Sequence, residues 1–148
     1  MADILHRTEI KSSTAETYKA LTTRERLAGW WTTDIQGNFN VGGVIEFRFG
    51  TRGRIDMKVI ELDPAKRVVW QVVNGPGEWI GSKVSFDLKQ DGDYTVVLFK
   101  HQGWKEPSEL MHHCSTKWAL FLMSLKSLVE TGTGAPFPND VHISGKGD

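Results

Sequence analysis

The stretch that decides the fold runs from Pro107 to Gly132 and reads PSELMHHCSTKWALFLMSLKSLVETG. Its apolar residues recur every three or four positions, the spacing of one helix face, and polar residues such as Lys117 gather away from them. The apolar set is Met111, Cys114, Trp118, Phe121, Leu122, Leu125, Leu128 and Val129. Pro107 suits a first turn, Glu109 suits its positive end, and Gly132 can adopt the left-handed conformation that ends a helix. The pattern predicts a long C-terminal helix with one buried face.

Upstream of this helix, the hydrophobic period changes to two, which indicates strands. The alternating sets are Ile45, Phe47 and Phe49; Ile55, Met57 and Val59; Val68, Trp70 and Val72; and Val84, Phe86 and Leu88. Residues 4–11 and 94–101 supply a first and a last strand. Turn signals rich in Gly, Pro, Asn and Asp separate the strands, and such short connections imply antiparallel pairing.

Between the first strand and the others, the caps Ser12, Ser13 and Thr14 precede two segments that favour short helices. The sequence therefore predicts an α+β fold, in which a curved antiparallel sheet of six to seven strands wraps around a long C-terminal helix. Two short helices follow strand 1. We expect a single domain over residues 1–138 and an irregular tail over residues 139–148.

The composition limits the classes of partner and the cellular compartment that we expect for this protein. The chain has 148 residues, the size of one domain, and its 18 basic and 18 acidic residues argue against nucleic acid as a partner. The single cysteine, Cys114, excludes an internal disulfide and suits a reducing cytoplasm. No segment approaches the ~20 apolar residues of a membrane span. We expect a cytoplasmic monomer or homodimer, since sheet edges can pair.

Three motifs join the order of elements in pointing to a known family: Leu27-Ala28-Gly29-Trp30-Trp31, the Gly42-Gly43 turn, and the helix end from Leu125 to Gly132. Over residues 4–138, the chain resembles the bacterial branch of the family named after the activator of Hsp90 ATPase, in the START-like, or helix-grip, superfamily. The resemblance implies a sheet gripping the C-terminal helix over a cavity for lipids, polyketides, plant hormones or other apolar ligands. It supplies no common catalytic residues. The resemblance gives only weak support to a role in Hsp90 regulation. The eukaryotic activator carries a second, N-terminal chaperone-binding domain, for which we expect no room in a chain of this length.

Geometry also predicts space beneath the sheet. A helix about 10 Å across cannot cover so wide a twisted sheet, so side chains fill the gap or an apolar pocket remains. Sequence leaves both possibilities open. The candidate cavity residues are Trp31, Phe47, Phe49, Met57, Trp70, Phe86, Phe99, His101, Met111, Cys114, Trp118 and Phe121. Trp118 is the foremost ligand contact, because it lies in the middle of the buried helix face.

The pair Trp30-Trp31 is expected at the end of the second short helix, where adjacent side chains cannot both point inward. We expect one of them in the core and the other at the mouth of the cavity.

A catalytic site is harder to find. The polar residues considered for acid or base chemistry are Glu46, Asp56, Glu61, Glu78 and His101. Strand alternation directs Glu46 and Asp56 to solvent, and His101 is better placed near the end of the last strand. The consecutive residues His112, His113 and Cys114 point about 100° apart on a helix and cannot converge on one metal ion. We assign no catalytic residue, no metal and no cofactor.

The predicted function is therefore binding of a small hydrophobic or amphipathic molecule between the sheet and the C-terminal helix, in a carrier, sensor or sequestering role. Two alternatives remain: a protein-interaction module of the Hsp90-activator type with a vestigial cavity, and a cyclase- or hydrolase-like enzyme.

Overall fold

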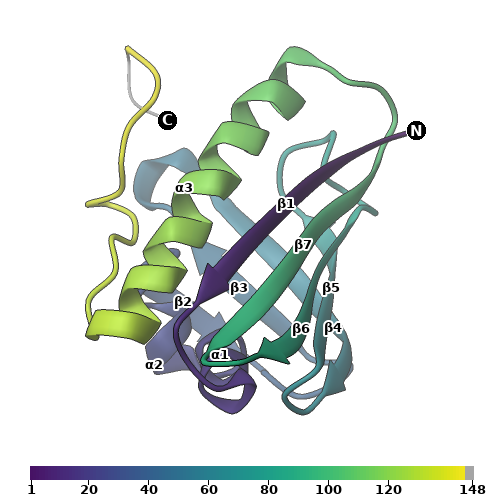
Figure 1. Ribbon diagram of the computed structural model, residues 1–148. Helices are drawn as coiled ribbons and strands as arrows, with labels where there is room; N and C mark the ends of the chain where they lie inside the picture. The colour runs from purple at the N-terminus through teal and green to yellow at the C-terminus, as the bar shows by residue number, and fades with distance from the viewer. Residues whose placement is uncertain (146–148) are drawn as a thin grey trace.

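The computed structural model describes residues 1–145, and its elements follow the predicted order of one strand, two short helices, six further strands and a long helix (Figure 1). The elements are β1 (Ala2–Ile10), α1 (Thr14–Thr22), α2 (Arg24–Leu27), β2 (Asp34–Gly37), β3 (Val44–Arg48), the 3-10 turn η1 (Gly50–Arg52), β4 (Arg54–Asp63), β5 (Arg67–Asn74), β6 (Lys83–Asp91), β7 (Tyr94–Trp104) and α3 (Glu109–Thr131).

The seven strands form one antiparallel sheet in the order β1-β7-β6-β5-β4-β3-β2. The sheet curves around α3, which crosses it diagonally (Figure 1). The hydrophobic pattern does not reveal β2. This strand has four residues and a single buried side chain, Ile35, so it carries no alternation to detect. The fold is the helix-grip arrangement that the sequence predicts.

The boundaries of α3 have local causes. Ser108 caps the N-terminus, because its hydroxyl accepts a hydrogen bond from the Met111 N–H at 3.3 Å. Pro107 thus precedes the helix, although the sequence had placed it in the first turn. At the other end, Gly132 adopts φ 87° and donates its N–H to the Leu128 carbonyl at 2.8 Å. The buried face follows the predicted stripe, with Ser124 added to it.

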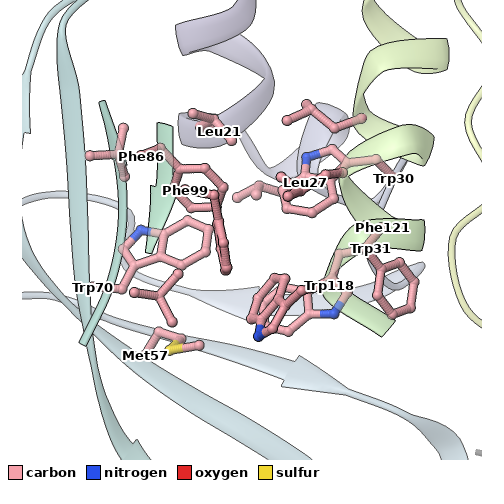
Figure 2. Close-up of a cluster of buried hydrophobic side chains, with 14 of the residues drawn as sticks. Leu21, Leu27, Trp30, Trp31, Met57, Trp70, Phe86, Phe99, Trp118 and Phe121 are labelled. Carbon is pink, nitrogen blue, oxygen red and sulfur yellow. The ribbon is translucent and has the colours of Figure 1, made fainter. Parts of the chain in front are cut away.

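Trp30 and Trp31 are both buried, so the expectation that adjacent side chains here cannot both point inward was wrong, although Trp31 does line the cavity described below. The reason is that α2 ends at Leu27, so neither tryptophan is helical and the helical geometry does not apply. Their rings stack 6.1 Å apart at an interplanar angle of 14°. The Trp30 indole donates to the Ala20 carbonyl at 2.8 Å. Figure 2 shows the pair between α3 and the core residues Leu27 and Phe99.

The segment after α3 turns back along that helix (Figure 1). Phe137 donates its N–H to the Trp31 carbonyl at 2.8 Å and accepts from the Thr33 N–H at 3.2 Å. A Cβ on Gly134 would collide with the Gly29 carbonyl oxygen, so only glycine permits this close approach. Residues 139–145 contain no helix or strand, and residues 146–148 of the predicted tail lie outside the described residues.

Candidate functional site

A cavity of about 530 Å³ opens between the sheet, the first half of α3 and the segment that follows it. Its walls come from the turn between β3 and β4, the loop between β5 and β6, three turns of α3, and two residues of the returning segment. The lining residues are Trp31, Phe49, Arg52, Gly53, Arg54, Ile55, Asn74, Gly75, Pro76, Trp79, His113, Cys114, Lys117, Trp118, Phe121, Phe137 and Asp140. The volume falls within the range of roughly 300–1,000 Å³ for small-molecule sites.

Aromatic rings form most of the interior wall. The Trp118 ring lies 5.1 Å from that of Trp31 and 6.0 Å from that of Trp79, to which it is nearly parallel at 25°. Phe49 packs edge-on against Trp31 at 5.6 Å and against Phe137 at 5.5 Å. Figure 2 shows Trp31, Trp118 and Phe121 gathered against α3. Rings in these arrangements offer flat apolar surface to a planar ligand.

Charged residues line the rim, and most of them have partners. Arg54 contacts Asp56 at 3.2 Å and Glu46 at 3.4 Å. Lys117 contacts Asp140 at 2.6 Å, and their side chains are only 12% and 5% exposed. Lys117, which the helical pattern placed on the polar side of α3, therefore bends toward the returning segment and reaches the cavity wall.

Arg52 differs from the other cations of the rim. It is exposed, and within residues 1–145 its guanidinium forms no ion pair with a carboxylate. Its nearest described partner is the Phe137 ring, whose centroid lies 5.6 Å from the guanidinium carbon. The energy of such a contact at an exposed site is about 0.5–1 kcal/mol, which leaves the hydrogen-bond donors of the guanidinium available.

Trp79 and Cys114 line the cavity side by side, and the indole N–H and the thiol have few hydrogen-bond partners. Trp79 is 6% exposed, and its indole N–H has no hydrogen-bond partner among the described residues. Burial raises the pKa of the Cys114 thiol to about 11, and the neighbouring Trp79 indole acts in the opposite direction. The thiol is therefore neutral at pH 7, and a thiol is a weak acceptor for an N–H donor.

His101 is held in a fully internal network. It is completely buried, and its Nδ1 accepts a hydrogen bond from the Trp118 indole at 3.1 Å. That acceptor role leaves the proton on Nε2, which donates to the Ser82 hydroxyl at 2.8 Å. The hydroxyl in turn donates to the Trp79 carbonyl. Burial lowers the pKa of His101 to about 4, so the ring is neutral at pH 7. This chain of bonds fixes the Trp118 ring at the cavity wall from behind.

The structure brings five of the predicted cavity residues to the cavity: Trp31, Phe49, Cys114, Trp118 and Phe121. The others lie elsewhere. Phe47, Met57, Trp70, Phe86, Phe99 and His101 are buried in the packed core, and Met111 is partly buried against it. The gap beneath the sheet is thus filled by side chains over most of its length and open at one end.

The acidic residues considered for catalysis do not line the cavity. Glu61 and Glu78 are exposed, and the Arg48 hydrogen bond lowers the pKa of the half-exposed Glu46. Asp56 was expected to face solvent but is only 8% exposed. The alternation places it opposite Met57, yet Arg54 and Asn74 cover its carboxylate there.

The polar rim of the cavity and two of its aromatic side chains, Trp79 and Phe137, are not evident from the sequence pattern. Trp79 lies in the loop between β5 and β6, and Phe137 lies in a segment without periodicity. Of the polar lining residues, Arg52 lies in η1, Asn74 is the last residue of β5, and Asp140 lies in the irregular segment after α3. In a strand or helix, the periodicity of apolar residues shows which side is buried, but residues in loops and turns carry no such signal.

A family model described as "Activator of Hsp90 ATPase homolog 1-like protein" matches residues 11–130. The chain belongs to this family. The match spans the chain from the end of β1 to the end of α3, so it includes most of the fold described above. A comparison with curated proteins found no match.

Solved structures agree with the family assignment. The Aha1 dimer from Colwellia psychrerythraea, solved in solution, is 47% identical, with a TM-score of 0.84 over 90% of this chain and 100% of that chain. Two more distant proteins share the fold. CalU16 from Micromonospora echinospora is 20% identical, with a TM-score of 0.77 over 96% of this chain and 74% of its own. SSP2350 from Staphylococcus saprophyticus is 14% identical, with a TM-score of 0.74 over 90% and 95%.

Within residues 1–145, no group of three or more His, Cys, Asp or Glu side chains is arranged to hold a metal ion. Within the same residues, no helix combines the length and apolar character needed to cross a membrane.

Proposed function

We propose that this protein binds a small hydrophobic or amphipathic molecule in the cavity between the sheet and α3. The observation that carries the proposal is the cavity itself: about 530 Å³, walled by Trp31, Trp79 and Trp118 and open at one end. Burial of a ligand's apolar surface against these rings supplies about 25 cal/mol per Å². A fold that used these aromatic residues only for packing would have closed this space, since protein interiors leave few voids larger than a water molecule.

A thermal-shift screen tests the proposal. The purified protein is heated with fatty acids, sterols, aromatic polyketides and small aromatic acids. A ligand at 100 times its dissociation constant adds about 2.7 kcal/mol to the free energy of unfolding, which raises Tm by about 5–10 °C in a chain of this size. A hit in one chemical class supports binding, and silence across all classes counts against it.

A pair of variants ties any hit to the cavity. Cys114→Phe places a ring into the cavity from α3, and we expect it to abolish the thermal shift. Leu5→Phe adds the same ring at a position on β1 that is 62% exposed, and it serves as the matched control. A shift that survives Cys114→Phe would show that the ligand binds elsewhere.

A second function, as a protein-interaction module, is favoured by the Colwellia psychrerythraea relative, which is described as an Aha1 dimer and is 47% identical. On this proposal the chain forms a homodimer and contacts a chaperone of the Hsp90 type. Light scattering coupled to size-exclusion chromatography measures the first part, and stimulation of Hsp90 ATPase measures the second. A monomer at all concentrations, without stimulation, would remove this function.

A further inference from the structure

The cavity has a polar character that points to the chemistry of its ligand. Three of its lining side chains are cations, Arg52, Arg54 and Lys117, and one is a carboxylate, Asp140. Asp140 and Arg54 are already paired, as described above, so the charge that remains for a ligand is the positive charge of Arg52.

The unused hydrogen-bonding groups agree with this charge. The Arg52 guanidinium at the rim is a donor that has no carboxylate partner among residues 1–145. One lining acceptor, Asp140 Oδ1, lacks a hydrogen bond among the described residues, but the His142 imidazole lies 3.8 Å from it. A ligand that satisfies Arg52 must therefore carry acceptors, and a planar guanidinium binds an anionic acceptor best.

A cationic ligand is the competing possibility, because aromatic walls also attract cations. Such a ligand would face Arg52, Arg54 and Lys117 across the cavity, and Asp140, the one lining carboxylate within residues 1–145, is neutralised by Lys117. A neutral apolar ligand would leave the Arg52 guanidinium at the rim without an anionic partner. Both alternatives are less favourable than an anion.

We infer that the ligand is an aromatic acid, whose planar body lies against Trp31, Trp79 and Trp118 and whose anionic group is held at the rim by Arg52. This inference rests on the proposed ligand-binding function. The exposure of Arg52 keeps the contact accessible to salt, so the preference for an anion should weaken as ionic strength rises.

Two fluorescent probes with the same aromatic body test the inference. Anilinonaphthalene sulfonate is anionic, and N-phenylnaphthylamine is the same ring system without the sulfonate. We expect the wild-type protein to bind the sulfonate about tenfold more tightly at low salt. Arg52→Gln should weaken sulfonate binding about five- to tenfold and leave binding of the neutral probe within about twofold. Arg7→Gln, which removes an exposed cation on β1, is the matched control and should change neither affinity.

Nuclear magnetic resonance locates the bound probes. The indole N–H signal of Trp79, assigned by its loss in Trp79→Phe, should shift on titration, whereas that of Trp30 should not, because Trp30 is bonded to the Ala20 carbonyl in the core. If both probes bind equally and shift the Trp79 signal, the acidic ligand is overturned and cavity binding stands. If Arg52→Gln weakens both probes equally, the role of Arg52 is overturned. If neither probe shifts that signal, cavity binding fails, and the inference fails with it.

Discussion

Acidification should destabilise this protein through His101. Burial lowers the pKa of this imidazole from 6.5 to about 4. Between these two values the unfolded chain binds a proton at this residue and the native protein does not, so stability falls as pH drops below 6.5 and reaches its full loss near pH 4. At about 1.4 kcal/mol per pKa unit, the full loss is about 3 kcal/mol, of which about 2 kcal/mol is reached by pH 5.

Urea denaturation at pH 7, 6 and 5, followed by tryptophan fluorescence, measures this loss. The variant His101→Gln removes the titrating group while keeping a donor and an acceptor, and His112→Gln removes an exposed imidazole on α3 as a control. The change of stability with pH, not the absolute stability, is compared. Wild type and the control should lose about 2 kcal/mol more than His101→Gln between pH 7 and pH 5. An equal loss in all three proteins would refute the assignment of a neutral, buried His101.

Three further predictions follow from single contacts. Trp118→Phe removes the donor to His101 Nδ1 and should cost about 1–3 kcal/mol in urea denaturation, and a cost near zero would mean that a water replaces the indole. Ser108→Ala removes the N-cap of α3 and should cost about 1 kcal/mol, with an unchanged urea midpoint contradicting the cap. Gly134→Ala should displace the segment after α3 and cost about 1–3 kcal/mol, detected as faster cleavage of that segment in limited proteolysis. Gly77→Ala, where a Cβ meets open space, is its control and should be cleaved like the wild type.

The fold could be predicted because the buried side chains of its main elements recur at regular, short spacings in the sequence. The apolar stripe of α3 and the alternation from Ile45 to Leu88 each depend on residues within a few positions of one another. β2 could not be found in this way, since it is a short edge strand whose place is set by pairing with β3. Its position is a property of the sheet and not of its own four residues.

The site was predictable only in part, for a related reason. Trp118 and Cys114 lie on the α3 stripe, so their burial was evident, but periodicity cannot tell a filled interior from an open one. Phe86 and Phe99 fill the space at one end, and the space is open beside Phe137 at the other. Both features depend on contacts between segments that are distant in the sequence. The end of α2 at Leu27, which turns both adjacent tryptophans inward, was equally invisible to the helical pattern.

Phe137 and Asp140 close one side of the cavity from outside the region that the family model matches, which ends at residue 130. These two side chains belong to the segment after α3. Hydrogen bonds of the Phe137 backbone and the Lys117–Asp140 ion pair hold this segment against the sheet and α3. Because the hydrogen bonds at Phe137 use its main-chain atoms, another side chain can replace the ring without loss of the bonds that hold the segment. On the proposed ligand-binding function, relatives with the same sheet and α3 can therefore differ in ligand preference through the side chains at positions 137 and 140.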